Sequence, residues 1–238
     1  AQAFDPRNLV LSGLDADLAL GPNHLKLRGD LAMADTRLDI DARAPALAAF
    51  WPGIPGAATL KAALAGTLAH QTLSVDAHYT PEHAREGVVG EAPVSAKLKV
   101  TGGWAPVGGV EGWRGTVDAL DAEHADLSVR SDRPVSLQYL LPADGSAAQW
   151  RVGAAQVQVG LAGEPILRLD HVSSEGQGTH WATIGGIDSL VISPDRIQKL
   201  EAWLGRGRGE QGGVHTALSE RAQHSRLEAK LDWSLKFT

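Results

Sequence analysis

The sequence has no cysteine among its 238 residues, which excludes disulfides, thiolate zinc sites, iron–sulfur clusters and a cysteine nucleophile. Basic residues are also in the minority, because 22 Lys and Arg stand against 28 Asp and Glu and give a net charge of −6. Nucleic-acid affinity comes largely from basic side chains that displace counterions. We therefore expect no nucleic-acid partner.

Long apolar runs are missing as well. The most apolar short run, residues 46–51, stops at Pro52, whereas a transmembrane helix needs about 20 apolar residues. The chain opens at Ala1 without an initiator methionine, a basic n-region or an apolar h-region. We expect a mature product or an excised piece of a longer protein, with any signal or membrane anchor outside these residues.

Catalytic signatures are absent from the sequence. It contains no G-x-S-x-G, Walker, kinase or H-E-x-x-H motif. Residues 207–212 match G-x-G-x-x-G, but the dinucleotide fingerprint needs a strand before it and a helix after it, so we interpret this segment as linker. The 9 histidines are scattered and fix no metal geometry. We predict that the protein is not an enzyme and uses no cofactor or metal.

Along much of the sequence, apolar and polar residues alternate with a period of two. Leu25, Leu27 and Leu31 alternate with charged residues, and the segment 227–237 alternates throughout. Such stretches are typical of strands with one apolar and one wet face. About fourteen of them recur every 10–15 residues or so between turn signals, which predicts an antiparallel all-β fold.

Two helices are predicted beside the strands. Ser193-Pro194-Asp195 reads as a helix start, and the apolar residues that follow at helical spacing predict a short amphipathic helix over 194–204. A weaker helix is expected over 45–50, before Pro52. Residues 205–213 are predicted to form a flexible loop.

The paired carboxylates and the tryptophans are expected to have structural roles rather than catalytic or binding ones. Asp15 with Asp17, and Asp39 with Asp41, share a strand face and alternate with apolar residues, so we expect them to face water. Because paired carboxylates can hydrolyse glycosides, a carbohydrate-active β-protein remains a third hypothesis. The 7 tryptophans are spread along the chain, which favours core or sheet-end packing over a sugar-binding or membrane-edge role.

The apolar face of the predicted sheet is the main functional candidate. Fourteen strands at about 4.8 Å spacing make a sheet about 65 Å long, which must close, fold into a sandwich or curl into a trough that holds an apolar ligand. We expect the predicted helix to cover one mouth of this surface through Ile197, Leu200 and Leu204. The predicted groove residues are Leu18, Leu27, Ile40, Leu73, Val75, Leu98, Val135, Leu137, Val157, Val159, Leu169, Leu227, Leu231, Trp233 and Leu235.

Several segments resemble the TamB family of AsmA-like bridge proteins, the inner-membrane component of the translocation and assembly module. Over residues 47–56 and 57–68 the sequence has, in this order, a predicted short helix, a proline-glycine pair, an apolar strand and Gly-Thr. Residues 71–77 continue the pattern with another apolar strand. Similar sequence patterns recur at residues 103–104, 112–120, 127–130, 134–137 and 150–157, so the resemblance covers about residues 10–235.

The resemblance implies a segment of an elongated, curled antiparallel sheet, a β-taco or trough with one or two short helices, continuous over residues 1–238. It also implies a periplasmic protein of Gram-negative bacteria, anchored in the inner membrane when full length, whose outer-membrane barrel partner binds outside this segment. The leading hypothesis is a bridge that carries phospholipid along its apolar groove. The alternative is a scaffold that helps outer-membrane proteins assemble by β-augmentation.

Overall fold

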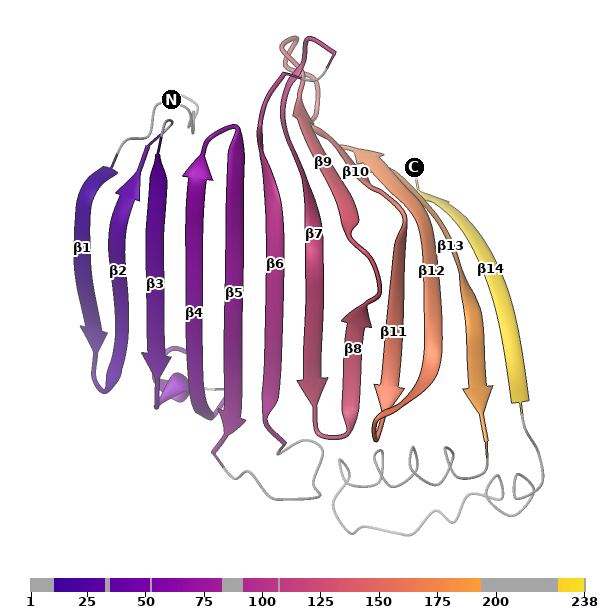
Figure 1. The fold of residues 1–238 in the computed structure, drawn as a ribbon, viewed down its shortest axis with the longest axis horizontal. Coiled ribbons are helices and arrows are strands. Elements are labelled where there is room, and N and C mark those ends of the chain that lie inside the picture. The colour runs from indigo at the N-terminus through magenta and orange to yellow at the C-terminus, as the bar shows by residue number, and fades with distance from the viewer. Residues whose placement is uncertain are drawn as a thin grey trace.

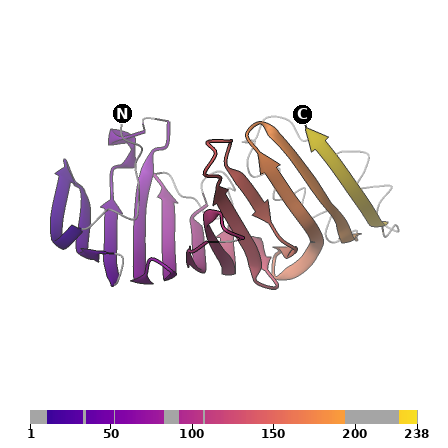
Figure 2. The ribbon, with the colours of Figure 1, turned by 90° about the horizontal axis from the view of Figure 1, so that it is seen from above.

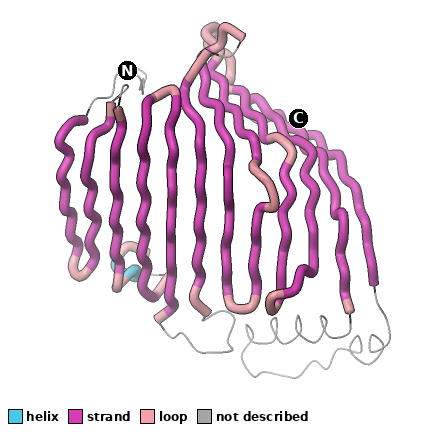
Figure 3. Tube along the Cα trace, viewed as in Figure 1, coloured by secondary structure: helices cyan, strands magenta, loops and turns pink. Residues whose placement is uncertain are grey.

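The computed structural model describes residues 11–32, 35–51, 53–82, 92–106, 108–193 and 227–237. Over this part of the chain the fold is a single antiparallel sheet of 14 strands, which confirms the predicted all-β fold and elongated sheet (Figures 1 and 3). The strands are β1 (Leu11–Leu20), β2 (Asn23–Leu31), β3 (Thr36–Ala44), β4 (Gly56–Thr67), β5 (His70–Pro81), β6 (Val94–Trp104), β7 (Glu111–His124), β8 (Leu127–Ser131), β9 (Val135–Leu141), β10 (Gln149–Val152), β11 (Ala155–Leu161), β12 (Glu164–Gln177), β13 (His180–Ile192) and β14 (Leu227–Phe237).

The sheet is a simple meander in which two positions are occupied by interrupted strands. β8 and β9 both pair with β7, one along each half, and β11 and β10 pair with β12 in the same way. The main-chain N–H of Asp132 donates to Gln156 O at 2.8 Å and that of Gly153 donates to Ser136 O at 2.8 Å, so hydrogen bonds bridge both interruptions. The 14 strands therefore fill 12 consecutive positions, since β8 with β9 and β10 with β11 count once each.

Cross-strand register places apolar residues on one face of the sheet from the first strand to the last. Residues directly opposite one another share a face, and so do residues two apart in one strand. Leu27 lies opposite Ile40, and Lys26 lies opposite Asp41. A slip of one residue would exchange the two faces, so the alternation in the sequence fixes the register.

Of the two predicted helices, only the first along the chain lies within the described residues. The segment expected to be helical over 45–50 contains only a short 3-10 helix, η2 (Leu47–Ala49). The predicted helix over 194–204 and the predicted loop over 205–213 lie outside the described residues. No helix in the described ranges is both long and apolar enough to cross a membrane.

The sheet is one layer thick, and its strands turn progressively from one end to the other (Figure 2). Because no second layer covers it, Ala92 and Leu161 are the only apolar residues in the described part that are buried. The chain exposes 15470 Å² of surface at a mass of 25.0 kDa. A compact monomer of that mass would expose only about 10,000 Å².

Candidate functional site: an open apolar face

One cross-strand row of apolar side chains runs across all 12 strand positions without a polar interruption. We call it the central row. Every neighbouring pair in it is directly opposed, so its side chains touch along the sheet. In order from β1 to β14 the row consists of Leu18, Leu25, Ala42, Leu60, Ala77, Ala96, Ala122, Val129, Val159, Leu167, Leu190 and Ala229.

A second apolar row lies beside the central row, two residues away on most strands and three away on β13, where the ladder has a register shift. It begins with Ala16, Leu27, Ile40, Ala62, Val75 and Leu98 and ends with Val157, Leu169, Ile187 and Leu231. Ser131 is its polar member, and the main-chain N–H of Leu120 donates to the Ser131 hydroxyl at 2.9 Å. The two rows together make the floor of a continuous apolar surface.

The predicted groove residues fall on this face. Those in the two rows are Leu18, Leu27, Ile40, Val75, Leu98, Val157, Val159, Leu169 and Leu231, and those beside the rows are Leu73, Val135, Leu137, Trp233 and Leu235. Leu227 is the first residue of β14, but its side chain lies outside the described part of the structure. The predicted cover residues Ile197, Leu200 and Leu204 are also outside the described ranges.

The apolar face is open to solvent, most of all on the two edge strands. Leu18 is 57% exposed on β1, and Leu231 is 57% exposed on β14. Across the sheet the face spans twelve strand positions, and along the strands it spans four levels of side chains, two of which are the rows just described. These dimensions give a surface of about 50 Å by 20 Å, or roughly 1,000 Å². The largest apolar patch on an ordinary soluble monomer covers about 300–600 Å², so this face is unusually large for a surface left in water.

One end of the face is roofed by the connection between β3 and β4, which contains η2 (Figure 1). Beneath it is a hollow of about 600 Å³, lined almost entirely by apolar atoms. The lining includes Leu18, Leu25 and Leu60 from the strands and Leu47, Phe50 and Trp51 from the connection. The β3–β4 connection therefore covers one end of the face, and the predicted cover over 194–204 lies outside the described residues.

Two polar side chains anchor this connection. Asn23, only 2% exposed, donates from Nδ2 to Ala46 O and accepts from the Ala46 N–H, both at 3.0 Å. At the other end, the Tyr79 hydroxyl donates to Pro55 O at 2.8 Å. Because both ends are held, the apolar residues between them are kept over the sheet.

The tryptophans form a row that the sequence analysis did not find. Six aromatic side chains lie at one level of the sheet, interrupted only by Gly176, and we call this set the aromatic row. Its members from β6 to β14 are Trp104, Trp113, Tyr139, Trp150, Trp181 and Phe237. Trp104 and Trp113 are directly opposed across the hairpin of β6 and β7, and the other members are brought to the same level only by the register of the whole sheet.

A small polar cluster lies on the same face between the apolar rows and the aromatic row. His171 Nδ1 lies 2.9 Å from Gly153 O, and its Nε2 lies 2.7 Å from the Ser174 hydroxyl. Ser174 and Thr183 share a hydrogen bond of 2.8 Å. The Gly153 carbonyl orients the imidazole, and the series of hydrogen bonds ends at the Thr183 hydroxyl, which accepts from Ser174.

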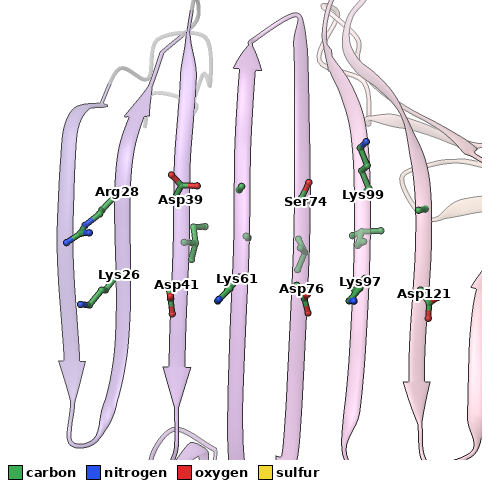
Figure 4. A pocket seen from close by; sticks show the side chains of 16 residues that line it. Lys26, Arg28, Asp39, Asp41, Lys61, Ser74, Asp76, Lys97, Lys99 and Asp121 are labelled. Atoms are coloured by element: carbon green, nitrogen blue, oxygen red, sulfur yellow. The ribbon is translucent and has the colours of Figure 1, made fainter.

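The opposite face is charged and confirms the expectation that its aspartates meet water. Asp15, Asp17 and Asp39 are exposed, and Asp41 is partly exposed. A row of alternating charge crosses the face over a shallow hollow of about 880 Å³ (Figure 4). From β1 to β8 its directly opposed members are Asp17, Lys26, Asp41, Lys61, Asp76, Lys97, Asp121 and Arg130.

This charge row is an exposed, balanced surface. Lys26 Nζ lies 3.5 Å from Asp17 Oδ2, and Arg130 Nε lies 3.0 Å from Asp121 Oδ2. Opposite charges at neighbouring positions make the hollow nearly neutral, which gives an ion of either sign little reason to collect there. Among the described residues no group of three or more metal-ligating side chains comes together.

Comparisons with known proteins leave the family of this chain open. No family model, no curated protein and no solved structure matches the chain.

Proposed function

We propose that this chain is a segment of a periplasmic bridge that carries phospholipid along its apolar face. The observation that supports the proposal best is the central row, which is apolar at every one of the 12 strand positions and lies on an open face. A ligand that touches this row meets the same chemistry at each step along the sheet. Movement from one position to the next therefore crosses no polar barrier.

The occupant we propose is the acyl part of a phospholipid. An uncovered apolar surface of roughly 1,000 Å² costs about 25 kcal/mol of unfavourable hydration, so occupancy by acyl chains would be strongly favourable. A chain of CH₂ groups needs no hydrogen-bond partner, and the two apolar rows contain almost no hydrogen-bonding groups. The resemblance to TamB-like bridges is consistent with the proposal, which gives the segment a periplasmic location and places its membrane contacts elsewhere in the full-length protein.

Neighbouring residues on β6 give a matched test. Leu98 belongs to the apolar rows, whereas Lys97 lies on the charged face opposite Asp76 and Asp121. A photoreactive phenylalanine analogue at Leu98 is expected to form a phospholipid adduct on irradiation in cells, and the same analogue at Lys97 is expected to form none. A third position, Leu167 on β12, should also form the adduct, because the row continues there.

The proposal fails if irradiation at Leu98 and Leu167 yields no lipid adduct in a folded protein, or if Lys97 gives as much adduct as Leu98. Mass spectrometry of the adduct identifies the lipid. Circular dichroism of each variant shows whether the sheet has formed.

A second candidate function is a scaffold for outer-membrane proteins. The observation that favours it is that, in the described sheet, β1 and β14 each pair with one neighbour only. A free edge can add a foreign strand by main-chain hydrogen bonding. Under this function, a photoreactive residue at Ser234 on β14, rather than at Leu98, captures an unfolded outer-membrane protein.

A further inference from the structure

The apolar face changes character along the direction of its strands. In the half of the sheet from β6 to β14, the central row and its neighbour are apolar except for Ser131. Closer to the aromatic row lie His171, Ser174 and Thr183, whose side chains can donate and accept hydrogen bonds. The aromatic row follows at the upper ends of these strands in Figure 1. Polarity thus rises from one side of the face to the other.

The tryptophans of the aromatic row have an unused donor. Among the described residues no indole N–H donates a hydrogen bond to another part of the chain, and Trp150 and Trp113 are half-buried. Tryptophan and tyrosine have an apolar body and a polar end, and for that reason they gather where hydrocarbon meets lipid headgroups. A ligand ester carbonyl at this level would accept from such a donor.

The dimensions match an acyl layer laid along the strands. On β6 the central row is represented by Ala96 and the aromatic row by Trp104, eight residues apart, which is about 27 Å in an extended strand. One leaflet of a bilayer has a hydrocarbon thickness of about 15 Å. The face therefore has room for the full length of an acyl chain between the two rows.

From this gradient we infer that bound phospholipid has a fixed orientation, with its ester and headgroup at the aromatic row and its chain ends toward the central row. This inference rests on the proposed function and adds the binding mode to it. The aromatic row then acts as a rail that holds each headgroup at one level while the lipid moves along the sheet. In the polar cluster the Thr183 hydroxyl accepts from Ser174, so its own hydrogen can be donated to a glycerol ester that passes.

Depth-dependent fluorescence quenching tests the orientation. Two variants of the 238-residue chain each keep one tryptophan, either Trp150 in the aromatic row or Trp51 in the β3–β4 connection over the apolar hollow, with phenylalanine at the other six tryptophan positions. Each is loaded from vesicles of phosphatidylcholine brominated either near the ester or near the chain end, and is then separated from the vesicles. We expect Trp150 to lose more emission to bromine near the ester, and Trp51 to lose more to bromine near the chain end.

The outcomes separate the two claims. Equal quenching of Trp150 by both lipids, or stronger quenching by the chain-end label, would overturn the orientation while leaving lipid binding intact. Loss of emission from neither tryptophan, in variants that keep the β-sheet signal in circular dichroism, would overturn the orientation together with the proposed function.

Discussion

At the scale of single residues, the surface of the apolar face depends on pairs of tryptophan and glycine. A methyl group added at Gly176 would lie 2.6 Å from ring carbons of Trp150, and one at Gly185 would lie 2.6 Å from the ring of Trp233. Each glycine lies directly opposite its tryptophan across the ladder. Because the glycine has no side chain, the indole can lie against the neighbouring strand and cover its backbone.

Valine at Gly176 should therefore displace the Trp150 ring. The backbone at this position is an ordinary strand conformation, so the effect comes from crowding. We expect the Gly176→Val variant to lose about 1–3 kcal/mol of unfolding free energy, measured by urea denaturation. Trp150→Ala on its own also lowers the unfolding free energy, because it removes ring contacts. In the double variant the valine has room, so the loss of unfolding free energy should be smaller than the sum of the two single-variant losses. Strictly additive losses would contradict the close contact.

The anchoring of the β3–β4 connection is also decided by single residues. Asn23 follows the Gly21-Pro22 turn in the sequence, where it reads as an ordinary turn residue. In the structure its side chain imitates a strand neighbour by giving and accepting one hydrogen bond with Ala46. Local sequence patterns cannot show this role, because the two residues are 23 positions apart.

At the scale of strands, the charge row sets the register on the side that faces away from the apolar groove. Lys61 on β4 lies directly between Asp41 on β3 and Asp76 on β5 (Figure 4). Each cross-strand pair of opposite charge is worth about 0.2–1 kcal/mol, and like charges directly opposite one another destabilise the sheet. A two-residue slip between β3 and β4 in one direction would bring Arg43 opposite Lys61, so the row penalises that incorrect pairing.

Reversing one charge in the row tests this role. Lys61→Glu places three carboxylates side by side, and we expect it to lower the unfolding free energy by about 1 kcal/mol because the site is solvent-exposed. Lys61→Gln, the control, should lose less than half as much. At 1 M salt the Debye length falls to about 3 Å and the difference between the variants should nearly vanish. A difference that persists at high salt would mean that packing, not charge, is responsible.

Strand alternation predicted most of the elements and the face on which the described groove residues lie. It was less informative where the ladder is irregular. β13 contains Gly185, Gly186 and a register shift beside Asp188, so its apolar residues lose the period of two. The interruptions at 132–134 and 153–154 read as loops between separate strands, whereas the structure aligns the pieces on either side as one strand position. The aromatic row could not be read from spacing, because its members come from six strands.

At the scale of the whole molecule, the sheet holds together without a conventional core. Main-chain pairing along 14 strands and side-chain contacts on each face must supply its stability, since nearly every apolar side chain in the described part keeps some exposure. A sheet of one layer leaves more surface in water than the compact packing of a monomer does. An apolar face that remains open in this way is expected to hold a ligand or a partner for most of its lifetime.

The central claim is that phospholipid acyl chains occupy this face, and the most direct measurement is the lipid content of the protein itself. Protein expressed in a Gram-negative host, with export to the periplasm, is purified without detergent, and its organic extract is analysed by quantitative mass spectrometry. We expect at least one phospholipid for each folded chain and a marked loss of lipid in a Leu98→Asp, Leu167→Asp variant that keeps its β-sheet circular dichroism. A folded wild-type protein whose extract contains no phospholipid would contradict the account.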